Sequence, residues 1–128
     1  MARKVQEQIV PADVVIVLTT LSAAADAGAL ANTLLGERLA ACVNVLAPMT
    51  SFYRWKGNVE RDEERQVIIK TTRAVLDRLE ARVLALHPYD TPEFLVLAVD
   101  GGGDAYLRWV AESTTASARI PFRLPPQL

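Results

Sequence analysis

The sequence predicts an α+β fold of the ferredoxin-like kind. We expect a βαββαβ sandwich with a long hairpin between its second and third strands and an extra C-terminal helix. Strand-like apolar runs and segments of helical periodicity follow one another in the order strand, helix, strand, strand, helix, strand. A turn of lysine, glycine and asparagine joins the two central strands. The length of 128 residues suits one compact domain.

The first strand and the first helix follow a polar lead-in of residues 1–12. Residues 14–18 are apolar and mostly β-branched, which is typical of a strand buried on both faces. Ser22 stands where a helix N-cap belongs, and small and aliphatic residues then recur at helical spacing over residues 23 to about 40. The sequence therefore predicts a strand followed by an amphipathic helix capped by Ser22.

The second and third strands form the predicted hairpin. The second strand covers residues 42–46, is interrupted by Pro48 and resumes over residues 51–55. Because proline cannot donate to a ladder, we expect a bend or bulge there. After the turn at residues 56–58, the third strand passes from a charged stretch into the apolar run 67–69. We expect a hairpin with a solvated tip and a buried base.

The second helix is expected to begin at Thr72, whose hydroxyl can cap it. Its apolar face is predicted to consist of Val75, Leu79, Val83 and Leu86. The helix ends before Pro88, because a residue that precedes proline avoids helical geometry.

The last elements are a fourth strand over residues 93–99 and a third helix. A triple glycine at 101–103 makes a turn, and the helix after it carries Tyr106, Trp109 and Val110. We therefore predict a domain over residues 13–112 and a tail over residues 113–128.

One face of the predicted sheet lacks a cover. Right-handed crossovers place the two main helices on the same face, and one short extra helix cannot cover the other. Another copy of the chain is the expected cover, so the sequence predicts an oligomer.

Composition excludes several classes of function. With 14 Lys and Arg against 15 Asp and Glu, no net positive field attracts nucleic acid. Cys42 is the only cysteine, so no disulfide forms within a chain. No apolar run approaches the ~20 residues that span a bilayer, and no signal peptide is recognisable. We expect a cytoplasmic protein that binds neither nucleic acid nor membrane.

Three stretches carry a resemblance to a known family. They are Leu-Ala-Ala-Cys-Val-Asn at 39–44, Ser-Phe-Tyr-Arg-Trp-Lys-Gly at 51–57 and His-Pro-Tyr-Asp-Thr-Pro-Glu at 87–93. In them the chain resembles the CutA family of divalent-cation tolerance proteins. The resemblance implies a tight homotrimer, related in architecture to the nitrogen-regulatory PII proteins. It also implies a link to copper and other divalent metals, and it implies no established reaction.

Three positions depart from the family pattern. Some bacterial members carry a cysteine where this chain has Thr19, and a second histidine where it has Leu86. An acidic residue is common at the position of Lys56. A copper site built on these groups is depleted in this chain.

His87, Cys42 and Glu64 are the candidate ligands of copper or another divalent cation. One cysteine and one histidine cannot close a tetrahedral site within one chain. Carboxylates such as Glu64 or Glu93 must therefore contribute, or equivalent residues must gather around a threefold axis. The alternatives are that His87 caps its helix by bonding the last carbonyls and that Cys42 is a small buried hydrophobe.

The candidate ligand-binding residues combine aromatic and polar side chains. Tyr53 and Trp55 alternate onto one face of the hairpin, and a pocket between subunits would use them. The alternative is an aromatic subunit interface, since tyrosine and tryptophan supply buried area with a polar tip. The full set is Tyr53, Trp55, Lys70, Tyr89, Glu93 and Trp109.

Together with the residues above, the resemblance implies a trimer without enzymatic activity. It is expected to bind a divalent metal of the copper type, or a small ligand, at clefts between subunits. The alternative is a PII-like signalling module that senses a small anionic ligand, although the glycines at 101–103 lack the G-x-G-x-x-G spacing. An enzyme is disfavoured, because no nucleophile, base and orienting group form a recognisable pattern.

Overall fold

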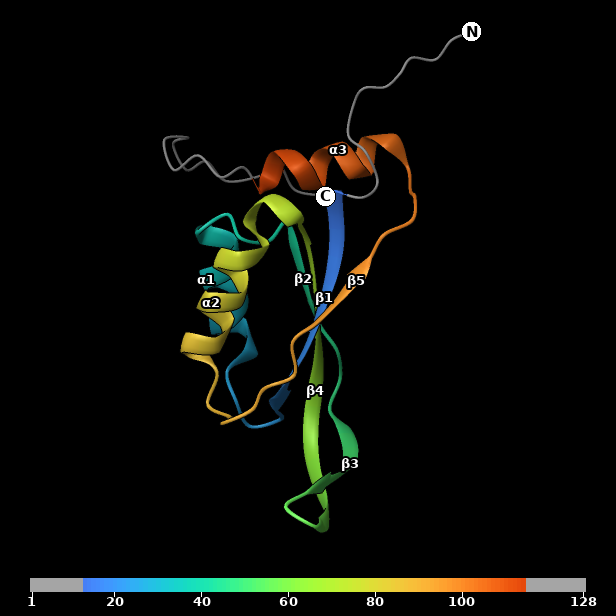
Figure 1. The fold of residues 1–128 in the computed structure, drawn as a ribbon. Helices are drawn as coiled ribbons and strands as arrows, with labels where there is room; N and C mark the ends of the chain where they lie inside the picture. Colours follow the sequence, from blue (N-terminus) through green and yellow to red (C-terminus); the bar gives the residue numbers. More distant parts are fainter. Residues whose placement is uncertain (1–12, 115–128) are drawn as a thin grey trace, which may run out of the picture.

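The computed structural model describes residues 13–114 and contains the predicted elements in the predicted order (Figure 1). The elements are β1 (Val14–Ser22), α1 (Ala27–Gly36), β2 (Cys42–Val45), β3 (Met49–Trp55), β4 (Asn58–Thr72), α2 (Leu76–Leu86), β5 (Leu95–Ala98) and α3 (Asp104–Ser113). The ferredoxin-like class is confirmed. The predicted lead-in, residues 1–12, and nearly all of the predicted tail lie outside the described residues.

The sheet is antiparallel, with the strand order β2-β4-β1-β5. Along β4 the register with β1 runs from Thr72, opposite Val14, to Glu64, opposite Ser22. The rest of β4 pairs only with β3, and the two form an arm that extends beyond the sheet (Figure 1). The long hairpin of the prediction is this arm.

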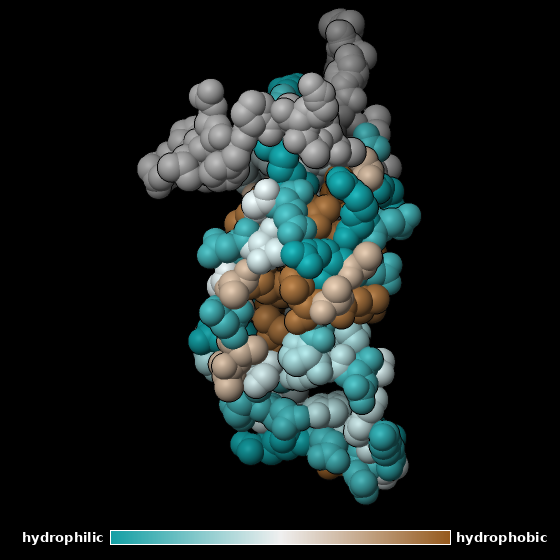
Figure 2. All heavy atoms as spheres, turned by 90° about the vertical axis from the view of Figure 1, so that its left-hand side faces the viewer, coloured by the Kyte–Doolittle hydropathy of each residue, from teal (hydrophilic) through white to brown (hydrophobic). Residues whose placement is uncertain are grey.

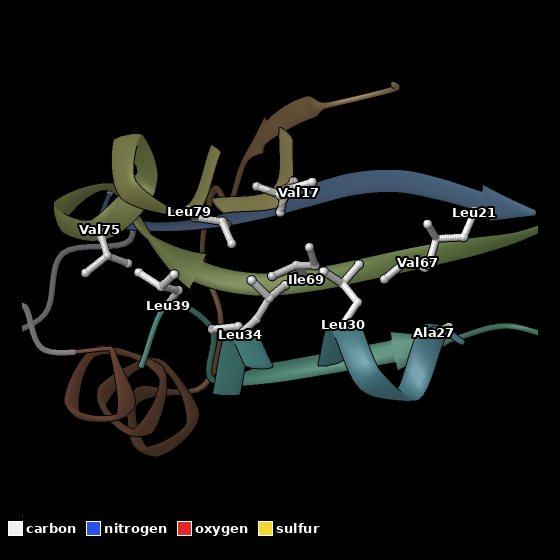
Figure 3. Close-up of a cluster of buried hydrophobic side chains, with 12 residues drawn as sticks. Val17, Leu21, Ala27, Leu30, Leu34, Leu39, Val67, Ile69, Val75 and Leu79 are labelled. Atoms are coloured by element: carbon white, nitrogen blue, oxygen red, sulfur yellow. The ribbon is translucent and has the colours of Figure 1, made fainter. Parts of the chain in front are cut away.

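The core lies between the sheet and the layer formed by α1 and α2, which both cover the same face (Figure 1). In Figure 3 Leu30 and Leu34 of α1 point toward Val67 and Ile69 of β4, and Leu79 of α2 lies beside Val17. These side chains are at most 9% exposed. Their burial against both helices positions the sheet and fixes which residues face away from the core.

A smaller cluster joins α3 to the opposite face at one end of the sheet. Val14 and Ala41 pack there against Leu107 and Val110. The end of α3 is held where the side chain of Arg38 donates to the carbonyl oxygen of Glu112 at 2.8 Å. The extra helix thus covers one end of this face.

The remainder of that face is apolar and uncovered within the described part of the chain. We call it the open face and define it by Ile16, Leu18, Ile68, Leu95 and Leu97, which share one side of three paired strands. Leu95 is 53% exposed and Leu97 46%. Adjacent exposed apolar side chains of this kind are typical of interaction surfaces.

The first helix begins later than predicted. Strand β1 continues through Ser22, which pairs with Glu64, so Ser22 is not the cap. Asp26 caps the helix instead, and its Oδ1 accepts from the backbone N–H of Ala29 at 3.0 Å. The helix ends at Gly36 rather than near residue 40. Pairing with β4 extended the strand past the point where local propensity suggested a helix.

The start of the second helix also differs from the prediction. Thr72 makes no capping hydrogen bond and instead pairs its hydroxyl with that of Thr114 at 3.0 Å. A single 3-10 turn, Arg73–Val75, precedes α2. Leu86 is 42% exposed and does not share the buried face of Leu79 and Val83, so that assignment was wrong. The predicted end before Pro88 is confirmed.

The interruption at Pro48 is a bulge, as predicted. Val45 pairs with Val67, and Met49 pairs with Glu64. Residues 46–48 therefore lie opposite only residues 65–66, which leaves one extra residue on the first strand. The fourth strand of the prediction is shorter than expected, since β5 covers only Leu95–Ala98.

Two buried threonines give a matched test of the core. The hydroxyl of Thr19 has no hydrogen-bond partner among residues 13–114, whereas that of Thr71 donates to the carbonyl oxygen of Leu39 at 2.8 Å. Both residues are 0% exposed. Thr19→Val is expected to raise the free energy of unfolding by about 1 kcal/mol and Thr71→Val to lower it by about 1 kcal/mol, measured by urea denaturation. Equal effects of the two changes would contradict this assignment.

Candidate functional site

Residues 87–93 link α2 to β5 and carry three of the candidate side chains. The helix stops because Pro88 follows His87, whose backbone is extended (φ −81°, ψ 134°). From there the chain crosses to β5, the edge strand beside β1. Three side chains of this segment bond to β1 and β4, and these bonds build the site.

His87 uses both of its ring nitrogens. Its Nε2 lies 2.7 Å from the carbonyl oxygen of Thr20 in β1, and the backbone N–H of Tyr89 donates to its Nδ1 at 3.2 Å. Because a carbonyl oxygen only accepts, we assign the proton to Nε2 and a lone pair to Nδ1. The predicted alternative, a side chain bonded to the last helix carbonyls, is not what the structure contains: the side chain bonds to β1.

Tyr89 joins this segment to the root of the hairpin. Its hydroxyl donates to the carboxylate of Glu64 at 2.7 Å, and its ring lies 4.7 Å from that of His87, centroid to centroid. Glu64 is only 7% exposed. A charge-assisted bond to a buried carboxylate fixes the position of the tyrosine.

Glu93 makes the third contact. The side-chain amide of Gln66 donates to the carboxylate of Glu93 at 2.9 Å and to the carbonyl oxygen of Thr19 at 2.8 Å. Gln66 lies on β4 two residues from Glu64, so both point to the same side of the strand. One face of β4 therefore receives both ends of the segment.

Tyr53 and Asp62 continue this arrangement along the hairpin. The hydroxyl of Tyr53 donates to Asp62 in a short hydrogen bond. Asp62 precedes Glu64 by two residues on β4 and shares its face. We call Tyr53, Asp62, Glu64 and Tyr89 the tyrosine–carboxylate cluster. It can accept hydrogen bonds from, or attract, a cationic or strongly hydrogen-bonding ligand.

The cluster keeps both phenols neutral to high pH. The hydrogen bond to Asp62, with desolvation and nearby carboxylates, raises the pKa of Tyr53 to about 12. Burial raises the pKa of Tyr89, as do its bond to Glu64 and the charge of that carboxylate. Both pKa values exceed the ~10 of a free tyrosine.

Stability should fall in alkali as a consequence. Above pH ~10 the unfolded chain loses phenolic protons that the folded chain keeps, so the free energy of unfolding decreases as pH rises toward the folded values. We expect Tyr89→Phe and Tyr53→Phe each to make this decrease less steep, measured by denaturation at pH 8 to 11. A variant with the wild-type pH dependence would contradict the cluster.

Lys70 and Cys42 lie elsewhere on the sheet. They are paired across β4 and β2, and Lys70 donates to the side chain of Asn44 at 2.8 Å. Lys70 is six residues from Glu64 along β4, which corresponds to about 20 Å of extended strand. A single chain therefore does not bring Cys42 or Lys70 to the cluster.

The two tryptophans lie toward opposite ends of the molecule. Trp55 stands beside the hairpin turn, opposite Asn58, with Lys56 5.7 Å from its ring centroid. Trp109 belongs to α3, packs against the small cluster there, and contacts Tyr106 with a centroid distance of 5.4 Å. Trp109 does not approach Tyr53 or Tyr89 within one chain.

A divalent metal does not fit the predicted ligands within one chain. Both nitrogens of His87 are engaged, and Cys42 lies far along the sheet from Glu64. Among residues 13–114, no three His, Cys, Asp or Glu side chains lie close enough together to hold an ion. Ligands from more than one copy would be required.

The candidate set predicted from the sequence omits two members of the site. Gln66 connects Glu93 to β1, and Asp62 binds Tyr53. Both could have been found from the alternation of residues 62, 64 and 66 on one face of a predicted strand.

In the described part of the chain, the helices are all too short or too polar to span a membrane.

The chain is similar to proteins of one family. A family model described as "CutA1 divalent ion tolerance protein" matches residues 15–113. "Divalent-cation tolerance protein CutA" of Thermus thermophilus is 43% identical over 99 residues, which cover 77% of this chain and 96% of that protein. The chloroplastic protein CutA of Arabidopsis thaliana is 46% identical over 85 residues, covering 66% of this chain and 47% of that protein. The crystal structure of CutA1 from Oryza sativa superposes with a TM-score of 0.78 at 38% identity, covering 84% of this chain and 98% of that one.

Proposed function

Because the chain belongs to the CutA1 family of divalent ion tolerance proteins, we propose that it is a homotrimeric binding protein without enzymatic activity. Its ligand is a divalent metal ion of the copper type or a small molecule, bound at clefts between subunits. The open face of its sheet, which is apolar and uncovered by residues 13–114, carries this proposal.

The open face supports assembly. Three adjacent strands present Leu18, Ile68 and Leu95 side by side on a surface that neither α1 nor α2 covers. Three copies that turn these surfaces toward a common axis remove the exposed apolar area from water, which favours association. The strand β5, whose four residues are all exposed, becomes protected in the same way.

The tyrosine–carboxylate cluster supports a ligand site at the resulting clefts. Glu64 and Gln66 share the side of β4 that carries Ile68, so the cluster borders the open face at the root of the hairpin. A neighbouring copy on the open face would form the opposite wall. The proposed binding residues also include four that neighbouring copies would bring together: Trp55, Lys70, Trp109 and Cys42.

Native mass spectrometry with Cu²⁺ or Zn²⁺ tests the binding proposal. We expect Glu64→Gln to reduce uptake of the bound species at least tenfold. Glu80→Gln serves as a matched control, because Glu80 is an exposed residue on α2, which covers the other face. Uptake that is unaffected by Glu64→Gln would count against a site at the cluster.

A cytoplasmic location is also a proposal. It rests on the use of cysteine, since the sequence has one and no disulfide forms within a chain, as is usual in a reducing compartment; the Arabidopsis relative is named chloroplastic. Fractionation of cells that express the full chain tests it.

A further inference from the structure

His87 has hydrogen bonds on both sides of its ring, and these decide its role. We infer that His87 is a positioning residue, which holds the segment 87–93 against β1 and sets the place of Tyr89, and that it is not a ligand of a divalent metal. The inference deepens the proposed function, because Tyr89 and Glu93 are proposed ligand-binding groups.

The histidine lacks a free lone pair for a cation. A metal-bound histidine often donates one ring N–H to a backbone carbonyl and turns its other nitrogen to the ion. The bond from Nε2 to Thr20 matches the first half of that pattern. The other nitrogen, Nδ1, faces the backbone N–H of Tyr89, whose partial positive charge occupies the place of the cation.

Further ligands are also missing around the ring. Among the described residues, no three His, Cys, Asp or Glu side chains gather to hold an ion. The phenol ring of Tyr89 lies 4.7 Å from the imidazole, centroid to centroid, and its hydroxyl already donates to Glu64. A metal at His87 would therefore have to displace the Tyr89 N–H without gaining two further His, Cys, Asp or Glu ligands from residues 13–114.

The ring instead fixes where the segment runs. The bond to Thr20 joins the first residue after α2 to β1, and the bond from Tyr89 closes a turn of three residues around the same ring. This turn directs the phenol of Tyr89 to Glu64 at the root of the hairpin. Glu93 and Gln66 secure the other end of the segment.

The test compares His87→Ala with His87→Gln in the full chain. Glutamine can still donate from its amide to the carbonyl oxygen of Thr20, whereas alanine cannot. The first readout is the ionisation of Tyr89 by ultraviolet absorbance, isolated by subtracting the titration of Tyr89→Phe. We expect His87→Ala to move the midpoint toward pH ~10, the value of a free tyrosine, and His87→Gln to restore much of the wild-type value.

The second readout is uptake of Cu²⁺ and Zn²⁺ by native mass spectrometry. We expect His87→Gln, which keeps Tyr89 in place, to take up as much metal as the wild type. A tenfold loss of uptake in His87→Gln together with a wild-type Tyr89 titration would overturn the inference and make His87 a ligand. An unchanged Tyr89 titration in His87→Ala would overturn the positioning role. Because the Tyr89 readout needs neither metal nor ligand, it is independent of whether the proposed function holds.

Discussion

Leu97→Asp is expected to dissociate the proposed trimer into folded monomers. Leu97 is 46% exposed in one chain and lies beside Ile16 on the open face. In a monomer the new carboxylate reaches water, so the fold survives. In the trimer it would be buried without a partner, which costs several kcal/mol. We expect the association constant, measured by sedimentation equilibrium, to fall at least 100-fold, since each ~1.4 kcal/mol is a factor of ten.

Leu84→Asp is the matched control for this change. Leu84 is 44% exposed, nearly the same as Leu97, but it lies on α2, which covers the other face of the sheet. Seen from the helix side, apolar side chains also gather near the middle of the molecule, while the hairpin end is mostly hydrophilic (Figure 2). Dissociation by Leu84→Asp and not by Leu97→Asp would place the subunit contact on the helix layer instead.

Among the substitutions proposed here for measuring stability, Leu79→Ala is expected to lower the free energy of unfolding most. Leu79 is 0% exposed and packs from α2 into the core that contains Val17 and Ile69. Truncation removes buried apolar area and leaves a cavity that close-packed neighbours fill only in part. Such changes lower the free energy of unfolding by about 2–5 kcal/mol. Urea denaturation at fixed protein concentration measures the loss.

Leu84→Ala controls for the truncation itself. It removes the same atoms from the same helix, but from a half-exposed position. We expect a change within about 0.5 kcal/mol, as is usual for surface substitutions. Equal losses in the two variants would mean that α2 packs on the sheet through a different face from the one described here.

Strong local signals were sufficient for much of the fold. Pro88 ends α2 because its ring disfavours helical geometry at the residue before it, which is a local effect. Pro48 marks the bulge because it cannot donate to a ladder. The prediction that Ser22 caps the first helix was wrong, because its pairing with Glu64 is a long-range contact that local propensity does not contain. The prediction that Thr72 caps the second helix was wrong for a similar reason, since its hydroxyl bonds to that of Thr114 instead of accepting from a helix N–H.

The site was predictable where its residues are neighbours in sequence. His87, Tyr89 and Glu93 belong to one short segment, and the structure ties all three to β1 or β4. Lys70 and Trp109 were grouped with these three residues on chemistry alone. Within one chain the structure separates Lys70 and Trp109 from the segment 87–93. A strand pattern says which face a residue occupies, but not how far along the sheet another segment crosses.

The mass of the metal-free full chain in native mass spectrometry tests the central claim most directly. One chain has a mass of 14.0 kDa, so a trimer of three chains has a mass of about 42 kDa (3 × 14.0). We predict that the trimer dominates at micromolar concentration, because the open face is apolar and residues 13–114 leave it uncovered. A dominant species of 14.0 kDa at that concentration would contradict the account.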